Sequence, residues 1–434
     1  MKYHGYMNEV NGVVPDTSCT AEYVAKMRLA MSDSSYSTPE ASLRLPFDEV
    51  LLKKSQSLAT KLAGPKLAYV LDIGIGGSNL GAKALYEATA GVLDPHTPFA
   101  PKMIFADTCS PELLADITEL LLDEIMDKEE IIIIIASKSG TTVETVINAS
   151  VLVIALEKKF GSLSDRIVCI TDEWSPLWDV GENKKYHLLP VPKMVGGRFS
   201  VFSPAGVFPL LCAGIDATQL MRGAQSVIHD TINRGVESNS FNAARDIIAW
   251  HKKGAVIFDF FAFHPELESV GKWYRQLFAE SLGKEKTIDS EPATHRMVPT
   301  VSIGSTDLHS VEQMHLAQPD IVARLLVRAH TPHWEHQFLA EDKVFAELVP
   351  GLSNRAPCEI LDAIYKGVKE TYDARGVSYG EISLTDISPE SLGSLLQFMM
   401  CTVMHLANLL NIDAFSQPNV EEYKDATRRI LKVK

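Results

Sequence analysis

A cluster of small hydroxyl side chains follows the most apolar run of the chain. Residues 131–136 read IIIIIA and the next six read SKSGTT. Hydroxyl groups can surround an anion, and Gly140 lets the backbone approach it closely. A helix that starts here adds unpaired N–H groups. Thr141 and Glu144 fit the S/T-x-x-E capping box, which predicts the helix start inside the cluster. A cap needs only one hydroxyl. We therefore interpret the cluster as a phosphate loop, against the simpler alternative of a cap, and its members are Ser137, Lys138, Ser139, Thr141 and Thr142.

A second glycine-rich turn, GIGGSNLGAK, covers residues 74–83. It is not a Walker A loop, because Gly81 is followed by Ala82 instead of Lys and Ser/Thr. It is not a dinucleotide fingerprint either, since Asn79 stands where Gly or Ala is expected. The turn indicates only a close backbone approach at Gly76, Gly77 and Ser78, and a packing turn explains it equally well.

A candidate general base lies in the stretch VGKWYRQLFAESLGK, residues 270–284. Gln276 and Glu280 are four residues apart and share a helix face. Gly283 predicts the end of this helix, which places Glu280 in the last turn. The helix dipole disfavours a carboxylate there, as suits a general base, although a solvated surface glutamate is the commoner explanation. The apolar stripe that should bury this helix is Val270, Trp273, Leu277 and Phe278.

Four more polar residues are candidates for catalysis or substrate binding. Arg198 emerges from GGRFSVFSPAG, as either a core ion-pair partner or an anion clamp. His309 precedes a second capping box, formed by Ser310 and Gln313 of GSTDLHSVEQ, at a strand-to-helix corner where proton transfer is possible. A lone histidine is more often structural. Gln417 and Lys424 are seven residues apart, which predicts two turns along one face of the last helix.

A histidine cluster, HTPHWEHQ, hints at a metal site. Its order is not H-E-x-x-H, and Pro332 interrupts any helix through His330, His333 and His336. We therefore expect no metal here.

Alternating short apolar runs and helical periods predict the elements that carry these residues. This pattern is typical of βαβ units with parallel sheets. Residues 299–315 repeat the strand–turn–helix shape of 131–146, so we expect two similar α/β domains. Residues 383–410 predict a buried helix opened by a Ser/Pro turn. The expected division is an arm at 1–45, domains at 46–235 and 236–410, and a C-terminal helical segment at 411–434.

Composition limits the possible partners. The chain has 434 residues, 46% of them hydrophobic, and a net charge of −14. This charge argues against nucleic acid or anionic membrane as the main partner. Six scattered cysteines without C-x-x-C indicate a reducing cytoplasm, and the first residues lack the apolar core of a signal peptide. The longest nearly apolar stretch, VFSPAGVFPLLCAGI, is too short to span a membrane. We therefore expect a soluble protein.

Six motifs together resemble the glucose-6-phosphate isomerase (phosphoglucose isomerase) family, in its prokaryotic form with two SIS domains. In order they are DIGIGGSNLG, ASKSGTTVET, GGRFSVFSPAG, ESLGK, GSTDLHS and QPNVEEYK, and the match runs from about 65 to 430. The resemblance implies two SIS-type domains, each a mainly parallel sheet flanked by helices, in a homodimer with shared active sites. It also implies reversible conversion of glucose 6-phosphate and fructose 6-phosphate without a cofactor.

The resemblance assigns a role to each candidate residue. Glu280 matches the base that moves a proton between C2 and C1 through a cis-enediolate, and Arg198 matches the residue that stabilises the enediolate. His309, reaching in from the neighbouring subunit, and Lys424 match the residues that assist ring opening. The hydroxyl cluster matches the phosphate loop, and the positions that match other substrate contacts are Gly77, Ser78, Gln276 and Gln417.

This chain departs from the family pattern at three positions. Leu308 stands where Gln is usual, Ser416 where Asp or Asn is usual, and Asn419 where Gly is usual. These changes bear on substrate preference more than on the reaction. Two alternatives remain: an isomerase that also acts on mannose 6-phosphate, and a non-catalytic SIS protein that senses sugar phosphates. A sensor has no need for Glu280, Arg198, His309 and Lys424 together.

Overall fold

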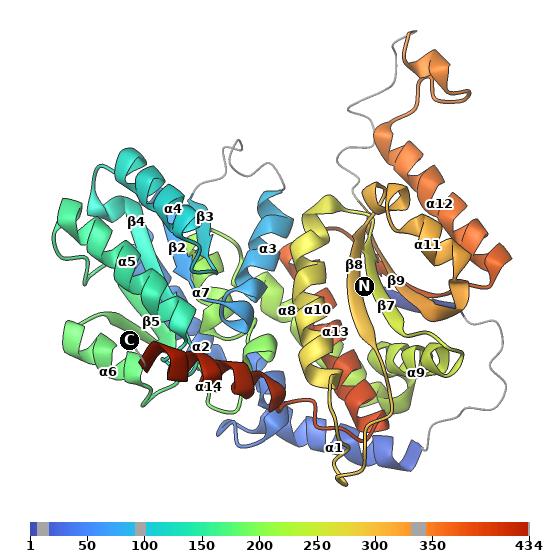
Figure 1. Ribbon diagram of the computed structural model, residues 1–434, viewed down its shortest axis with the longest axis horizontal. Coiled ribbons are helices and arrows are strands. Elements are labelled where there is room, and N and C mark those ends of the chain that lie inside the picture. Colours follow the sequence, from blue (N-terminus) through green and yellow to red (C-terminus); the bar gives the residue numbers. More distant parts are fainter. Residues whose placement is uncertain (7–16, 92–100, 331–343, 433–434) are drawn as a thin grey trace.

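Two five-stranded sheets lie side by side, with helices between them and over their outer faces (Figure 1). The computed structural model describes residues 1–6, 17–91, 101–330 and 344–432. The expectation of two α/β units, each built on a mainly parallel sheet, is confirmed.

The first sheet has the strand order β3-β2-β4-β5-β6, and every pair is parallel. The run IIIIIA forms its central strand, and all six residues are buried because helices cover both faces. The strands are β2 (Tyr69–Ile73), β3 (Lys102–Ala106), β4 (Ile131–Ala136), β5 (Ile167–Thr171) and β6 (His187–Pro190).

Helices from both sides pack on this sheet. Alternate side chains of β2 and β4 face a small core shared with α4 and α5, and the remaining ones face the interior of the molecule. The helices of this half are α2 (Glu49–Leu62), α3 (Leu80–Ala90), α4 (Pro111–Glu124), α5 (Val143–Phe160), α6 (Pro176–Lys184) and α7 (Pro204–Cys212).

The second sheet repeats the topology of the first. Its order β8-β7-β9-β10-β1 matches β3-β2-β4-β5-β6 position by position, but β1 is antiparallel to β10. The N-terminal arm therefore supplies the fifth strand of this sheet. The strands are β1 (Lys2–Tyr6), β7 (Ile257–Ala262), β8 (Val298–Ile303), β9 (Val322–Ala329) and β10 (Ser378–Leu384).

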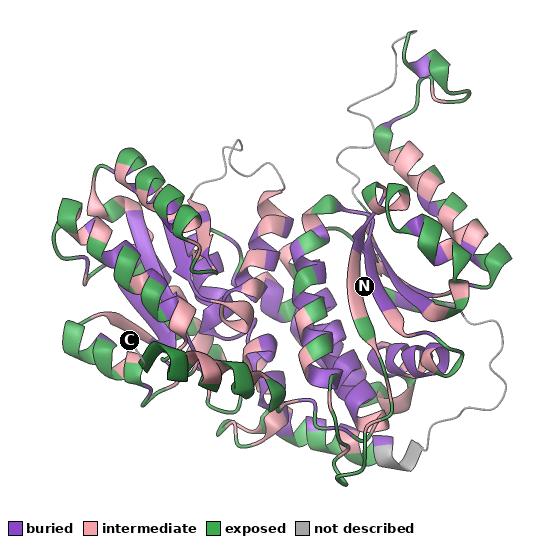
Figure 2. Ribbon diagram, in the orientation of Figure 1, coloured by how far each residue is buried: buried purple, intermediate pink, exposed green. Residues whose placement is uncertain are grey.

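One long helix, α13 (Pro389–Leu409), runs through the middle of the molecule. Ser388 caps its first turn, as the Ser/Pro turn predicted. Among the described residues it alone is long and apolar enough to cross a membrane, but 83% of that stretch is buried inside the protein (Figure 2). The other helices around and beside the second sheet are α1 (Thr17–Ser32), α8 (Ala217–Arg234), α9 (Asn239–Lys252), α10 (Glu268–Leu282), α11 (Glu312–Ala317) and α12 (Pro357–Arg375). The last helix, α14 (Asn419–Lys432), extends toward the first half of the molecule (Figure 1).

A single large core joins the two halves. It contains inward-facing residues of both sheets, the predicted apolar stripe of α10 and most of α13, as the continuous buried band of Figure 2 shows. Burial of this extent fixes the two sheets relative to each other.

Strand order predicts where each sheet can bind a ligand. In an open parallel sheet the binding crevice lies where successive connections leave in opposite directions, at the carboxyl ends of the strands. In the first sheet this point lies between β2 and β4, so the crevice is bordered by the GIGGS turn and the SKSGTT loop. In the second sheet it lies between β7 and β9. There His264 Nε2 is 3.0 Å from the backbone N and O of Ala329, which bridges the two strand ends.

Candidate active site

The SKSGTT loop connects the end of β4 to the N-terminus of α5. Gly140 has φ +68°, a conformation that favours glycine, and a Cβ there would lie 2.7 Å from the Leu177 nitrogen. The Ser137 hydroxyl lies 2.9 Å from that of Thr142, and Thr171 Oγ1 donates to the Ser137 carbonyl at 2.6 Å. The neighbouring strand thus holds the loop in shape.

The predicted capping box is wrong in its details. The residue before α5 is Thr142 instead of Thr141, and its side chain accepts no hydrogen bond from the helix, because it turns toward Ser137. The first turn of α5 therefore keeps N–H groups that no side chain caps, beside a loop of hydroxyls. An anion is the natural partner for such a helix start.

The GIGGS turn packs directly against the GGRF turn. A Cβ at Gly77 would lie 2.1 Å from the Gly197 carbonyl carbon and 2.5 Å from the Arg198 nitrogen. The Ser200 hydroxyl joins the two turns by donating to the Gly77 carbonyl at 3.0 Å. The close approach indicated at Gly77 is thus to another backbone turn, the one that carries Arg198. Asn79 closes its own turn by donating to the Gly74 carbonyl at 2.7 Å.

Arg198 is the hub of the site. Its side chain is only 2% exposed, and its Nη1 lies 3.2 Å from Glu280 Oε2 and 3.2 Å from Gln417 Oε1. Its Nε donates to Ser281 Oγ at 2.8 Å, and its Nη2 donates to the carbonyls of Ala414 and Ser416. The guanidinium therefore joins the end of α10 to the segment before α14. Burial lowers the pKa of Arg198, and the Glu280 carboxylate opposes that shift.

Glu280 occupies the last turn of α10, as predicted, with 28% of its side chain exposed. Its Oε1 accepts from Gln276 Nε2 at 2.9 Å, so the predicted shared face is confirmed. Gln276 Oε1 is buried without a partner among the described residues, and its Nε2 lies 3.0 Å from where a Cβ of Gly76 would stand. A carboxylate fixed by an amide and a guanidinium can accept a proton from a bound ligand.

Two lysines lie next to this hub. Burial lowers the pKa of Lys138; nearby Asp172 opposes the shift, and Arg198 and Lys193 add to it. Burial also lowers the pKa of Lys284 to about 8, with Arg198 adding to the shift. Lys138 and Lys284 thus each lie close enough to Arg198 for its charge to lower their pKa, and an anionic ligand would relieve this repulsion.

The structure does not bring every candidate residue into this cluster. Within the described residues, no hydrogen bond or ion pair joins His309 or Lys424 to Glu280 or Arg198. His309 is exposed at the end of a 3₁₀ turn, Thr306–His309, just before α11. Lys424 Nζ pairs with Glu421 Oε1 at 2.7 Å on α14.

Two further local predictions need correction. Gln417 precedes α14, which begins at Asn419, so Gln417 and Lys424 do not share a helix face. Ser310 does not cap α11; its hydroxyl donates to Asp307 Oδ1 at 2.7 Å instead. The predicted end of α10 is confirmed, since Gly283 is its C-cap.

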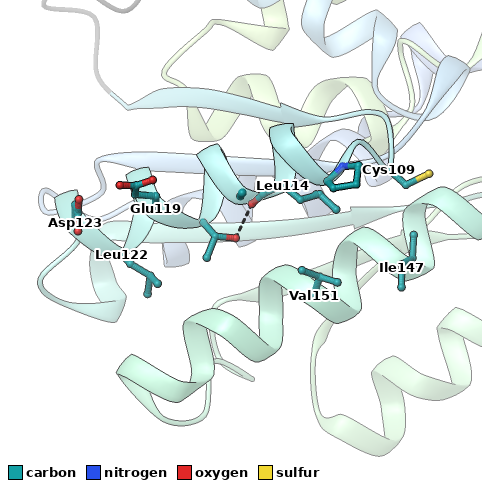
Figure 3. A pocket seen from close by; sticks show the side chains of 10 residues that line it. Cys109, Leu114, Glu119, Leu122, Asp123, Ile147 and Val151 are labelled. Carbon is teal, nitrogen blue, oxygen red and sulfur yellow. Dashed lines mark hydrogen bonds between the residues drawn. The ribbon is translucent and has the colours of Figure 1, made fainter.

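Two hollows lie near the first sheet but away from Glu280. An apolar hollow of about 740 Å³ separates α4 from α5, with Cys109 at one end and Glu119 and Asp123 at the other (Figure 3). A more polar hollow of about 590 Å³ includes Lys138, Ser139 and Trp174. The first contains no candidate residue, and the second touches only the phosphate loop.

The described residues contain no group of His, Cys, Asp and Glu side chains arranged to hold a metal ion. Of the histidine cluster, His333 and His336 lie outside the described residues.

Several groups at or near the site were not predicted from the sequence. Thr145, in the first turn of α5, has a buried hydroxyl without a partner among the described residues, and its spacing from the loop could have indicated it. Lys284 ends the ESLGK motif, and its Nζ donates to the Glu280 carbonyl at 2.7 Å. The Ala414 and Ser416 carbonyls leave no signal in side-chain chemistry.

Comparison with known proteins identifies the family of this chain. The model of the phosphoglucose isomerase family matches residues 53–433. The chain belongs to the phosphoglucose isomerase family. It is 34% identical over 364 residues to the glucose-6-phosphate isomerase of Mycoplasmopsis synoviae, covering 83% of this chain and 81% of that protein. It is 30% identical over 372 residues to that of Methanocaldococcus jannaschii, covering 84% of each.

Solved structures support the fold of this phosphoglucose isomerase family member. A hypothetical protein from Thermus thermophilus superposes with a TM-score of 0.82 at 25% identity, covering 96% of both chains. A glucose-6-phosphate isomerase from Chlamydia trachomatis superposes with a TM-score of 0.74 at 22% identity, covering 99% of this chain and 80% of that one. The two units are SIS-type domains, as expected.

Proposed function

We propose that this protein interconverts glucose 6-phosphate and fructose 6-phosphate through a cis-enediolate, as an aldose–ketose isomerase of glycolysis and gluconeogenesis. The observation that carries this proposal is the Glu280 carboxylate, held by Gln276 and Arg198 beside an uncapped helix start. Family membership and the names of the relatives agree with it.

The phosphate group binds at the SKSGTT loop. Uncapped N–H groups of α5 and the loop hydroxyls supply donors, and nearby Lys138 adds positive charge. These groups hold the non-reacting end of the sugar, so their binding energy positions C1 and C2 at Glu280.

Glu280 moves the proton. In the open-chain aldose its carboxylate removes the C2 proton, the electron pair forms the C1=C2 bond, and negative charge develops on O1. The O2 proton passes to O1, and Glu280 returns its proton to C1, which leaves a C2 ketone. Arg198 stabilises the charge on the enediolate oxygens. Gln276 and Gln417 orient the hydroxyls, with Gly77 and Ser78 closing the opposite wall.

Within the described residues, Lys424 and His309 do not contact Glu280. We assign ring opening to Lys424 and, from a second copy of the chain, to His309. A homodimer with shared sites is therefore the active form. The other attributes proposed are no cofactor, no nucleic-acid or membrane partner, a cytoplasmic location, and domains at 46–235 and 236–410 between the arm and the C-terminal segment.

The decisive experiment follows fructose 6-phosphate by NMR in metal-free D₂O, with mannose 6-phosphate in a parallel tube. We expect glucose 6-phosphate to appear with solvent deuterium at C2. Glu280→Gln should lower kcat by roughly 10²–10⁴-fold while a non-reacting phosphosugar analogue still binds. Conversion of both sugars would indicate a relaxed pocket at C2. Binding without conversion by the unmodified protein would contradict the proposal and favour a sensor.

A further inference from the structure

Lys284 lies at the junction between the end of α10 and the C-terminal segment, and the proposed mechanism gives it no role. Its Nζ donates to the Glu280 carbonyl at 2.7 Å and to the Ser416 carbonyl at 2.5 Å. Arg198 Nη2 donates to the same Ser416 carbonyl at 3.3 Å. Two cations therefore converge on one backbone oxygen, next to Gln417.

The residues after Lys284 continue the contact with the C-terminal segment. The Ile288 nitrogen donates to the Asn411 carbonyl at 2.8 Å, and Asn411 Nδ2 donates to Asp289 Oδ2 at 2.5 Å. Asn419 Nδ2 donates to Glu285 Oε1 at 3.0 Å. Four residues of 284–289 thus hydrogen-bond to residues of 411–419.

Asn419 extends this contact to the last helix, because it is the first residue of α14. Its side-chain amide bonds Glu285. The Asn419–Glu285 hydrogen bond therefore fixes the start of α14, the helix that carries Lys424.

We propose that Lys284, with Glu285 and Asn419, forms a latch that holds residues 411–419 on the end of α10 and so positions Gln417 and Arg198 around Glu280. Lys284 is a positioning residue in this proposal, since it contacts Arg198's partner carbonyl and the backbone of Glu280. The catalytic part of the inference rests on the isomerase proposed above, whereas the latch itself does not.

Hydrogen exchange measured by mass spectrometry on the full chain tests the latch directly. Lys284→Met should raise exchange across 411–419 by about tenfold or more, because this segment would open locally, and leave β4 unchanged. The matched control is Lys272→Met, which removes an exposed lysine from α10, the helix just before Lys284; Lys272 pairs with Glu268 at 2.8 Å. Lys272→Met should leave 411–419 unchanged. Unaltered exchange at 411–419 in Lys284→Met would overturn the proposal.

Kinetics then test the positioning role. Lys284→Met should lower kcat/KM for fructose 6-phosphate by roughly 10- to 100-fold, and Lys284→Arg, which keeps the charge, should recover part of it. Unchanged kcat/KM with faster exchange would overturn the positioning role alone. If the unmodified protein fails to isomerise but the exchange result holds, the latch stands and the proposed function fails.

Two mild variants keep the proposal testable if Lys284→Met unfolds. Asn419→Gly and Glu285→Ala change exposed residues, and each should raise exchange at 411–419 by roughly two- to fivefold. The double variant should be no worse than either single one, because both remove the same bond. No change in either variant, or fully additive effects, would contradict the Asn419–Glu285 part of the latch.

Discussion

At the scale of single residues, the site depends on a buried polar side chain, Arg198, whose role is to form hydrogen bonds. Arg198 directs its donors to two segments that lie far apart in the sequence, 280–281 and 414–417. Such an arginine orders the site before any ligand arrives, which lowers the reorganisation needed during reaction. Two other residues give predictions at this scale. Asp72 is buried without a hydrogen-bond partner among the described residues, and Gly77 packs tightly against another turn.

Asp72, in the middle of β2, gives a pH-dependent prediction. It is fully buried, neither of its oxygens has a partner among the described residues, and burial raises the pKa of this carboxyl well above its usual value. The folded protein keeps a proton that the unfolded chain releases above about pH 4. Asp72 therefore lowers stability increasingly as pH rises above about 4. Asp72→Asn should raise the thermal midpoint at about pH 7.5 and lose that advantage near pH 4, in calorimetry at both pH values.

Gly77 gives a steric prediction. A methyl group there would collide with the backbone of Gly197 and Arg198, at 2.1 and 2.5 Å. Gly77→Ala should cost about 1–3 kcal/mol of unfolding free energy and lower kcat by displacing Arg198. Gly64, where an added Cβ would meet nothing within 4 Å, is the control. Equal denaturation midpoints for Gly77→Ala and Gly64→Ala would show that the two turns separate freely.

At the scale of elements, several candidate residues lie at the ends of helices or strands: the SKSGTT loop follows β4, Glu280 lies in the last turn of α10, and His309 precedes α11. The turn that carries His309 is anchored behind it by a buried ion pair: Glu312 Oε2 lies 3.1 Å from Arg324 Nη2 on β9. Arg324 is fully buried, and its guanidinium lies 4.5 Å above the ring of Tyr372, whose hydroxyl also reaches Glu312. The pair ties α11 to the second sheet.

Breaking that pair should destabilise the protein and disable His309. Glu312→Gln leaves the Arg324 charge buried without its partner, which costs about 3–5 kcal/mol. Glu381→Gln is the matched control, because it breaks the Lys369–Glu381 pair of the same sheet away from α11. Denaturant unfolding should show a lower free energy of unfolding in both variants, with the larger decrease in Glu312→Gln. Activity per folded molecule should fall only in Glu312→Gln. Equal specific activities would mean that α11 needs no such anchor.

At the scale of the whole molecule, we propose that the site is complete only across two chains. Glu280 belongs to α10, which lies between the two sheets, whereas α11 lies beside α12 at the outer side of the second sheet (Figure 1). His309 is exposed in the turn just before α11. A residue exposed in one chain can complete the site of another copy.

Mixed dimers test this arrangement. Inactive Glu280→Gln and inactive His309→Ala chains, once exchanged, should recover up to about a quarter of the unmodified activity, because each mixed dimer has one intact site. Glu312→Gln should recover activity with Glu280→Gln but not with His309→Ala, which would group it with His309. Demonstrated subunit exchange without any recovery would mean that each site lies within one chain.

Much of this protein could be predicted from its sequence, because the signals involved are local. Periodicity predicted β4, α10 and the buried α13, since each depends on burying one face or a whole segment. The hydroxyl cluster predicted an anion loop at a helix start, because donor-rich loops there have few other uses. Gln276 and Glu280 could be paired because helix geometry fixes residues four apart.

Other features were decided by the tertiary structure. The caps at Thr141 and Ser310 were predicted wrongly, since each hydroxyl had a choice of nearby partners and tertiary packing selected among them. The strand from the arm, the Arg198 hub and the Lys284 latch join segments far apart in the sequence, and no local pattern encodes such a contact. Backbone carbonyls such as that of Ser416 leave no trace in sequence, because every residue has one. Sequence determined which side chains could do the chemistry, and the packing of two sheets on one core decided which of them meet.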